Sequence, residues 1–324
     1  MKLVIQIPCL DESQTLPATI KDLPTALPGI DDIRVIVVDD GSDDGTADVA
    51  ASLDAAVVRF PTTRGLAAAF STGVEAALLL DADIIVNTDG DNQYRGGDVA
   101  LLIAPIVAGR ADIVIGARPI ATMREFSWIK KVLQRAGSWV VRRLSGTTIV
   151  DATSGFRAYS REAALRLEVF SGYTYTLETI VQGANCGLRI ASVPVGVNAV
   201  VRKSRLMRGS AHYVMRAGTG LVRMFVVYRP FRFFIIPGAA AIAIAMLIGL
   251  RFLWLFVESG GAAGHLQSLL LSAILFGLGG ALTVVAFLGD LIAINRRMLE
   301  DLRLDARRQR FDALRRARRG TDCA

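Results

Sequence analysis

The chain contains 324 residues, of which 52% are hydrophobic, and it carries a formal net charge of +7 at pH 7. Its length accommodates one substantial domain with an appendage, and its mean hydropathy of +0.42 is high for a soluble protein. Positive charge gathers beside two apolar runs and in the tail Arg296–Arg319, so we attribute it to a lipid bilayer and expect no nucleic-acid partner.

Apolar, β-branched runs alternate with segments of helical spacing along the N-terminal part of the chain. The runs predict strands at Leu3–Ile7, Ile33–Val38, Val57–Phe60, Ile84–Asn87 and Ile113–Ile115. The segments between them predict helices at Gln14–Leu23, Gly45–Leu53, Gly65–Leu79 and Val99–Ala108. Strands that are apolar on both faces and joined by helices indicate an α/β fold with a mostly parallel sheet flanked by helices.

Acidic turns follow three of the predicted strands, at Asp11–Glu12, Asp39–Asp40 and Asp89–Asp91. Ligands of such sheets bind at the carboxyl ends of the strands. Two carboxylates one residue apart, Asp89 and Asp91, predict a site for a hard divalent cation that carries a diphosphate. Asp81-Ala82-Asp83 precedes its strand, so we assign it to the opposite rim as a solvated turn.

Other kinds of site are disfavoured by the sequence. No glycine-rich GxGxxG or GxxxxGK[ST] loop is present, which argues against a Rossmann dinucleotide site and a P-loop. The two histidines lie far apart, and the three cysteines have no metal-ligand spacing. The cysteines therefore indicate a reducing compartment rather than a metal centre.

Two long apolar runs follow, Phe233–Leu250 without any charge and Leu266–Ile294 with Asp290 alone. Each is long enough to cross a bilayer as a helix, and the alternative is a buried helical hairpin of a soluble domain. Arginines flank both runs, whereas the connector Glu258–His265 has no Lys or Arg. The positive-inside rule then predicts a two-span protein of the inner (cytoplasmic) membrane with both termini in the cytoplasm. The N-terminal run is too short for a signal peptide.

Five motifs occur in order along the first two thirds of the chain. They are IPCLDES at 7–13, VVDDGSDDGT at 37–46, NTDGDNQ at 87–93, GAR at 116–118 and DATSGFRAYSR at 151–161. Together they resemble glycosyltransferase family 2 of the GT-A fold, and more narrowly its polyprenyl-phosphate sugar synthases, of the dolichol-phosphate mannose synthase and bactoprenol glucosyltransferase type. The resemblance covers roughly Leu3–Leu206, and the two apolar runs suit its two-span bacterial members.

The resemblance divides the chain into four expected parts. Residues 1–203 form a cytoplasmic GT-A catalytic domain, and residues 204–232, which mix arginines with apolar residues, form an amphipathic helix on the inner leaflet. Residues 233–294 contain the two transmembrane helices, and residues 295–324 form a basic cytoplasmic tail. The same resemblance allows a homo-oligomer.

On the donor side, the resemblance implies a nucleoside-diphosphate sugar. Pro8, Asp11 and Glu12 would line the base and ribose, and Asp40 would accept a hydrogen bond from one of them. Asp39 belongs to the same turn, and the alternative for both aspartates is capping of the following helix. Asp89 and Asp91, with Gln93 alongside, would hold Mg²⁺ or Mn²⁺ against the diphosphate and neutralise the charge that builds on it.

On the acceptor side, the resemblance implies polyprenyl phosphate, which is already ionised and needs no strong general base. A cationic cradle would hold this anion, with Arg118, Arg135 and Arg202 as candidates. Arg157 and Ser204 join the substrate-binding set because they lie in matching motifs. Asp151 would face the acceptor, and Glu178 is either an acceptor-side carboxylate or an ion-pair partner.

These expectations predict a membrane-anchored, metal-dependent, inverting transferase that moves one hexose from a UDP- or GDP-sugar to polyprenyl phosphate. A processive polysaccharide synthase is the first alternative, but its Gln-x-x-Arg-Trp motif is missing from the sequence. A non-catalytic, nucleotide-sugar-binding membrane scaffold is the second. The sequence leaves both the sugar and the base open.

Overall fold

A seven-stranded sheet forms the centre of the N-terminal region in the computed structural model. The strands are β1 (Lys2–Cys9), β2 (Asp32–Asp39), β3 (Ala56–Arg59), β4 (Ile84–Asn87), β5 (Ile113–Ala117), β6 (Arg157–Ser160) and β7 (Ile190–Pro194). Their order is β3-β2-β1-β4-β6-β5-β7, and β6 runs antiparallel to β4 and β5 while the other pairings are parallel. The predicted mostly parallel α/β sheet is therefore confirmed.

The structure describes residues 1–119, 137–139, 141–143, 145–169, 175–198, 219, 222–223, 225–259 and 266–321. They fall into two compact units, Met1–Ala217 with Arg303–Ala324, and Gly218–Leu302. We call the first the catalytic unit, after the role that the sequence leads us to expect, and the second the helical unit, and describe each by itself.

Helices of the catalytic unit follow the predicted pattern closely. The structure has α1 (Leu16–Asp22), α2 (Thr46–Ser52), α3 (Leu66–Leu79) and α4 (Val99–Val107), the last preceded by a short 3₁₀ helix, η1 (Gly96–Asp98). Two further helices, α6 (Arg161–Arg166) and α7 (Thr176–Asn185), were not predicted. Ser160 caps α6, because its side chain accepts a hydrogen bond from the amide of Ala163.

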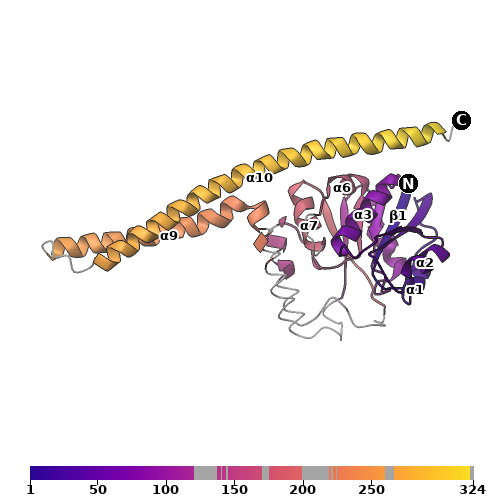
Figure 1. Cartoon of the computed structure of the whole chain (residues 1–324), viewed down its shortest axis with the longest axis horizontal. Coiled ribbons are helices and arrows are strands. Elements are labelled where there is room, and N and C mark those ends of the chain that lie inside the picture. The colour runs from indigo at the N-terminus through magenta and orange to yellow at the C-terminus, as the bar shows by residue number, and fades with distance from the viewer. Residues whose placement is uncertain are drawn as a thin grey trace. The chain divides into compact units, whose positions relative to one another are not determined.

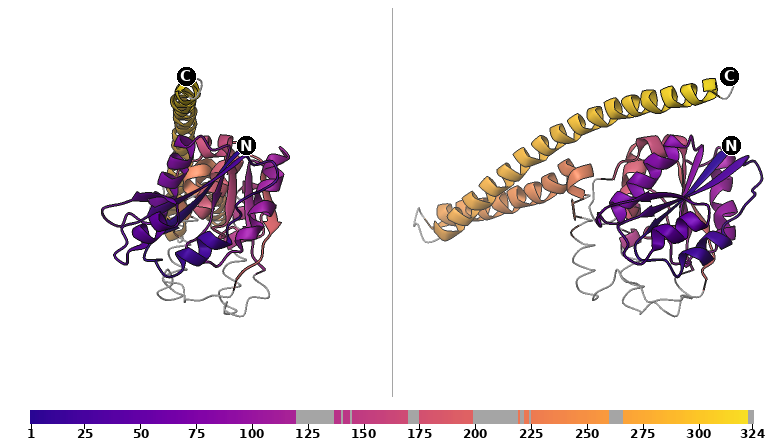
Figure 2. Two further views of the ribbon diagram at one scale, coloured as in Figure 1. Left: turned by 90° about the vertical axis from the view of Figure 1, so that its right-hand side faces the viewer. Right: turned by 45° about the vertical axis from the view of Figure 1, so that its right-hand side comes forward.

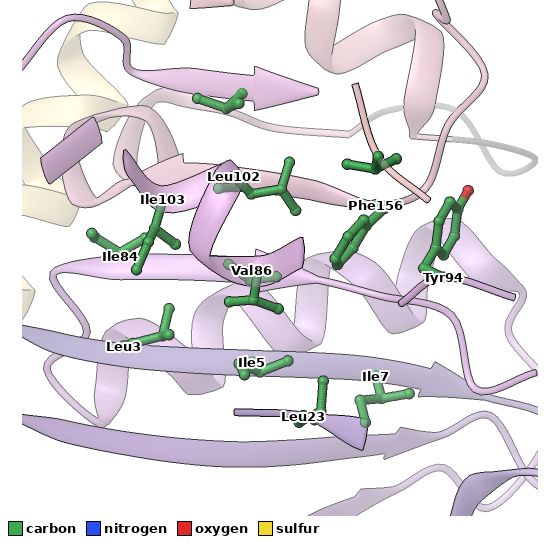
Figure 3. Close-up of a cluster of buried hydrophobic side chains, with 14 of the residues drawn as sticks. Leu3, Ile5, Ile7, Leu23, Ile84, Val86, Tyr94, Leu102, Ile103 and Phe156 are labelled. Carbon is green, nitrogen blue, oxygen red and sulfur yellow. The ribbon is translucent and has the colours of Figure 1, made fainter. Parts of the chain in front are cut away.

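Helices cover both faces of the sheet (Figure 2). Because side chains alternate along a strand, each strand feeds two layers of core. On one face, β1 side chains such as Leu3 and Ile5 join a buried cluster with Leu102 and Ile103 of α4 (Figure 3). On the other face, α3 packs so closely on β1 that a Cβ on Gly73 would lie 2.0 Å from Oε1 of Gln6.

The helical unit contains α9 (Pro230–Glu258) and the first part of α10 (Leu266–Thr321). Both helices are long and apolar enough to cross a membrane, and only 11% of the apolar window of each is buried. A core helix of a soluble domain would be mostly buried, so this exposure indicates membrane association. The two helices pack through small residues, since a Cβ on Gly238 would lie 3.2 Å from the carbonyl oxygen of Gly279.

The C-terminal arginine-rich segment continues the second apolar helix. Residues 295–324 were expected to form a separate basic tail, whereas α10 runs without interruption from Leu266 to Thr321. Figure 1 shows α10 as one continuous helix. Its residues from Arg303 onward belong to the catalytic unit.

Two adjacent glycines test how the loop after β4 is fixed. A Cβ on Gly96 would lie 2.2 Å from the backbone oxygen of Asp22 at the end of α1, whereas one on Gly97 would meet nothing within 4 Å. Gly96→Ala should therefore lower the free energy of unfolding by about 1–3 kcal/mol through overpacking, and Gly97→Ala should leave it nearly unchanged. Thermal unfolding of the two variants in detergent measures the difference, and equal melting temperatures would contradict this packing.

Candidate active site

The acidic turns meet at one rim of the sheet because of strand register. Cys9 of β1 pairs with Asp39 of β2, and Gln6 of β1 pairs with Asn87 of β4. All three strands are parallel, so the turns that follow them emerge at the same edge. Asp81 and Asp83 precede β4 and lie at the opposite end of that strand, as predicted.

The first two turns hold each other in place. The amide of Asp11 donates to Oγ of Ser42 at 2.9 Å, and the amide of Asp43 donates back to Oδ1 of Asp11 at 3.2 Å. The amide of Glu12 donates to Oγ1 of Thr46 at 2.9 Å. Asp11 has a φ of +50°, an uncommon conformation for a residue with a side chain, and these bonds stabilise it.

Asp39 and Asp40 are both buried and both brace loops. Oδ1 of Asp39 accepts from the amide of Ser42 at 3.0 Å, and its Oδ2 lies 3.2 Å from Nε of Arg59. Oδ1 of Asp40 accepts from the amide of Arg64 at 2.7 Å, and its Oδ2 accepts from the amide of Gly65 at 2.9 Å. The carboxylate of Asp40 thus fixes the loop that leads into α3.

A hollow lies beside these aspartates. Its volume is about 290 Å³, and it is lined by Gly41, Ser42, Asp43, Arg59, Phe60 and Pro61. The guanidinium carbon of Arg64 lies 5.1 Å from the ring centroid of Phe60, within the range of a cation–π contact. Pro8 lies within buried β1, paired with Val38 of β2, close to the rim but inside the sheet.

Gly155 leaves room for the side chain of Asp89, and Gly90 leaves room for the neighbouring side chain of Cys9. A Cβ on Gly155 would lie 2.8 Å from Oδ1 of Asp89, and a Cβ on Gly90 would lie 2.8 Å from Sγ of Cys9. Loss of water around Asp89, followed by the negative charge of Asp91, raises the pKa of the Asp89 carboxyl to about 7. The charge of Glu12 adds to this rise in pKa.

Asp89 and Asp91 would hold a divalent cation, whose positive charge would offset both the loss of water around Asp89 and its repulsion by Asp91. Within the described part of the chain, no three His, Cys, Asp or Glu side chains come close enough to hold a metal by themselves. Mg²⁺ takes few carboxylates and completes its shell with water and substrate phosphates, so this sparse set is compatible with it. The backbone amide of Gln93 donates a hydrogen bond to Oδ1 of Asp91 at 3.1 Å and so helps to position that carboxylate.

Arg118 and Asp151 form a paired unit beside Asp89. Nε of Arg118 lies 2.7 Å from Oδ2 of Asp151, and its Nη2 lies 3.2 Å from Oδ1. Nη2 also donates to Oγ1 of Thr153 at 3.0 Å. Asp151 is fully buried, and the side chain of Arg118 is 10% exposed. Both residues were assigned to the acceptor side without any contact between them, and their pairing means that much of the guanidinium is already engaged by the carboxylate.

Arg157 takes a different place from the one expected of a substrate-binding residue. Its side chain is fully buried. Nε donates to the carbonyl of Ser154 at 2.7 Å and Nη2 to that of Ala152 at 2.8 Å, while Nη1 donates to the carbonyl of Thr176 at 2.6 Å and to Oγ1 of Thr179 at 2.8 Å. Every guanidinium nitrogen is therefore used within the protein, and Arg157 joins the 152–154 loop to α7.

A buried polar network beneath the rim escaped the sequence analysis. Nε2 of Gln6 donates to Oδ1 of Asn87 at 3.0 Å. Nδ2 of Asn87 donates to the carbonyl of Gly155 at 2.9 Å and to the hydroxyl of Tyr175 at 2.8 Å. The ring of Tyr175 stacks on Phe70 of α3 with centroids 3.9 Å apart. The signal in the sequence was a Gln and an Asn inside otherwise apolar strands, since such residues need buried partners.

The remaining predicted residues fall into two groups. Glu178 lies in the first turn of α7 and is 7% exposed, which places it inside the protein near Thr179. Arg135, Arg202 and Ser204 lie outside the described residues.

Comparison with known sequences gives a family. The Glycosyl transferase family 2 model matches residues 4–167, which is half of the chain. A polyprenol monophosphomannose synthase of Mycolicibacterium smegmatis is 30% identical over 204 residues, covering 59% of this chain and 76% of the relative. An undecaprenyl-phosphate mannosyltransferase of Micrococcus luteus is 32% identical over 206 residues, covering 60% of this chain and 83% of the relative.

Solved structures agree on the fold. Glucosyl-3-phosphoglycerate synthase from Mycobacterium tuberculosis, in complex with Mn²⁺, uridine diphosphate and glucosyl-3-phosphoglycerate, superposes with a TM-score of 0.55 at 22% identity. The match covers 69% of this chain and 78% of that one. At this identity the likeness shows the fold alone, a GT-A-like sheet flanked by helices. Together with the matched family model and the mannosyltransferase relatives, it shows that the chain belongs to glycosyl transferase family 2.

Proposed function

We propose that the protein transfers one hexose from a nucleoside-diphosphate sugar to polyprenyl phosphate at a membrane surface. The observation that carries the proposal is the parallel register that brings the acidic turns after β1, β2 and β4, including Asp89 and Asp91, to the ligand-binding rim of the sheet. Two relatives named for polyprenyl-phosphate mannosyl transfer support the acceptor. A UDP-N-acetylglucosamine–dolichyl-phosphate N-acetylglucosaminyltransferase of Methanococcus voltae, 29% identical over 188 residues, supports the same acceptor class with another sugar.

On the donor side, Asp89 and Asp91 would hold Mg²⁺ or Mn²⁺, and the Mn²⁺ and uridine diphosphate in a structure of the same fold support this. When bound, the metal would neutralise the charge on the leaving nucleoside diphosphate. The braced turns at Asp11 and Asp40 would orient the nucleotide, with the base in the hollow lined by Arg59 and Phe60. Asp40 would act by fixing the 64–65 loop.

On the acceptor side, a phosphate oxygen attacks the anomeric carbon while the bond from that carbon to the diphosphate oxygen breaks. The diphosphate leaves with the bonding electron pair, and attack from the opposite side inverts the anomeric centre. A phosphate monoester is ionised at neutral pH, so Asp151 and Glu178 need not take up a proton. Arg118 would attract the phosphate, and we retain Arg135, Arg202 and Ser204 as acceptor-side candidates.

The membrane arrangement remains a proposal built on α9 and α10. Both helices would span the inner membrane, with the catalytic unit and both termini in the cytoplasm, because the connector between the two runs lacks Lys and Arg.

A labelled-sugar assay tests the function directly. Purified protein is incubated in vesicles with polyprenyl phosphate, divalent metal and a panel of UDP- and GDP-sugars, and the lipid fraction is analysed. A single hexose on the lipid supports the proposal and identifies the donor. Binding without a lipid product would favour the non-catalytic scaffold, and a long polysaccharide product would favour a processive synthase.

Asp91→Asn tests the metal-binding assignment. Because loss of even an outer-shell partner lowers metal affinity about 10- to 100-fold, we expect at least about a hundredfold loss of lipid-linked product. The variant should stay folded, since Asp91 is exposed. Near-wild-type activity at saturating metal would remove Asp91 from the metal site.

The raised pKa of Asp89 predicts a pH-dependent stability. The folded pKa of about 7 exceeds the ordinary value of 3.8, so the native state binds more protons than the unfolded state between these values. Wild-type stability without metal should therefore fall as pH rises from about 4 to about 7. Asp89→Asn removes this loss and should melt at a higher temperature than wild type at pH 8, but not at pH 4.

Metal should reverse that difference, because Mg²⁺ or Mn²⁺ stabilises only the protein that retains both carboxylates. Melting curves with metal and with chelator measure both effects. The exposed Asp48→Asn serves as a control for removing one carboxylate elsewhere. A melting-temperature difference between wild type and Asp89→Asn that stays the same from pH 4 to pH 8 without metal would contradict the raised pKa.

Gly155→Ala tests whether the position of Asp89 matters to the chemistry. The new Cβ would lie 2.8 Å from Oδ1 and 3.0 Å from Oδ2 of Asp89 and would push the carboxylate aside. Since a displacement of about 1 Å costs on the order of a hundredfold in rate, kcat/KM should fall by about that factor. Gly97→Ala, which meets no neighbour, is the matched control. Full activity of Gly155→Ala would show that the rim tolerates the shift.

A further inference from the structure

A group of carboxylates lies on the catalytic unit away from the rim that holds Asp89. Two of them, Asp81 and Asp83, precede β4, whereas Asp89 follows that strand, so they belong to its opposite end. The others lie on or beside the neighbouring helices α3 and α6, which Figure 1 labels. We call this group the acidic surface, and its members are Glu75, Asp81, Asp83, Glu162 and Glu168.

Arginines of α10 pair with every part of the acidic surface. Nη1 of Arg303 lies 2.5 Å from Oε1 of Glu168, and Arg308 pairs with Glu162 of α6. The list of ion pairs is completed by Arg310 with Glu75 at 3.0 Å and by Arg315 with Asp81 at 2.9 Å and Asp83 at 3.4 Å. The turn that the sequence analysis described as solvated is thus occupied by Arg315, and by Arg161 at 3.2 Å from Asp81.

Two further contacts distinguish this arrangement from scattered surface pairs. Phe311 is only 2% exposed, so the segment has an apolar anchor. Nη1 of Arg307 donates to the carbonyls of Leu165 and Leu167 at 2.9 and 3.2 Å, where the last carbonyls of α6 lack helical partners. Arg307, Phe311 and Arg315 are four residues apart, which places them on one face of the helix.

Isolated surface ion pairs contribute little to stability, but a set organised around a buried aromatic residue and a helix end is a specific contact. An arginine that pairs with the acidic surface is also unavailable to an anionic lipid headgroup. These observations replace our attribution of the segment's charge to lipid. The occupant of the acidic surface is residues 303–315 of this same chain.

We propose that residues 303–315 form an intramolecular strap that fastens the catalytic unit to the second apolar helix. The strap is continuous with that helix, since α10 is unbroken from Leu266 to Thr321. Resting on the proposed function, the strap ties the catalytic unit to a helix of the bilayer that contains the acceptor. Transfer to polyprenyl phosphate then depends on the strap, because orientation of the reactants sets the rate, whereas donor binding at the opposite rim does not.

Limited tryptic digestion of the full chain in neutral detergent tests the docking. When opening is fast, cleavage follows the population of the open state. In the wild type, the cleavage sites after Arg307 and Arg308 should be protected at about 0.05 M salt. They should be cleaved faster at about 0.5 M salt, because dissolved ions screen the attraction between the arginines and the carboxylates. Arg315→Glu should speed cleavage about tenfold, which corresponds to about 1.4 kcal/mol.

The adjacent Arg316 supplies the matched control, because it is exposed and makes no ion pair among the described residues. Arg316→Glu makes the same charge change and should leave cleavage at the wild-type rate. A charge swap between Glu75 and Arg310 gives a second test, in which the double variant can form the ion pair again with its charges exchanged. Glu75→Arg and Arg310→Glu should each speed cleavage, and the double variant should restore protection.

Several outcomes overturn the strap. These are equal cleavage of Arg315→Glu and wild type, equal effects of Arg315→Glu and Arg316→Glu, and protection that appears only in anionic vesicles. The last result would return the arginines to the lipid. No recovery in the charge swap would also reject the Glu75–Arg310 pairing.

Activity then tests the coupling separately from the docking. In vesicles, Arg315→Glu should lower transfer to polyprenyl phosphate about tenfold and leave the affinity for nucleoside diphosphate unchanged, whereas Arg316→Glu should match wild type. Full transfer by an undocked Arg315→Glu would overturn the coupling. A wild-type protein that is protected from trypsin but makes no lipid-linked product would overturn the proposed function, and the coupling with it, and leave the docking supported.

Discussion

Repulsion between carboxylates gathered at one rim of the sheet is the constraint on which the rest of the structure depends. Parallel register brings the turns after β1, β2 and β4 to the same edge, and every charge there raises the energy of its neighbours. Asp39 and Asp40 are stabilised by backbone amides, and Asp151 is stabilised by Arg118. No described residue donates a hydrogen bond to Asp89, and loss of water, followed by the negative charge of Asp91, raises the pKa of its carboxyl.

The carboxylate of Asp89 can act at this rim only if it stays in place, and two buried groups beneath the rim position it. Asn87 binds the carbonyl of Gly155, whose missing side chain leaves the space that Asp89 occupies. Arg157 ties the preceding loop to α7 through backbone carbonyls. Removing either partner would leave buried polar groups unsatisfied, so the geometry of the rim is fixed from below.

The sequence predicted what is local and periodic, and less of what depends on distant partners. Strands such as Ile84–Asn87 were found because they are continuous apolar runs, whereas β6 carries Arg157 and Ser160 in four residues and has no such signal. The acidic turns were placed correctly because strand polarity follows from the α/β pattern. Arg157 was assigned to substrate because an arginine in a motif looks the same whether its partners are phosphates or carbonyls, and only packing distinguishes them.

The C-terminal arginines are a second example of residues whose partners the sequence alone does not reveal. A run of arginines after an apolar helix satisfies the rule for anionic lipid, and their partners at Glu75, Asp81 and Glu162 are scattered through the chain without any pattern. A fold shared with a glucosyl-3-phosphoglycerate synthase also leaves the acceptor undetermined, since that structure holds a phosphoglycerate product. This chain carries two long apolar helices, and the strap that we propose would join the catalytic unit to one of them, which suits an acceptor that cannot leave the bilayer.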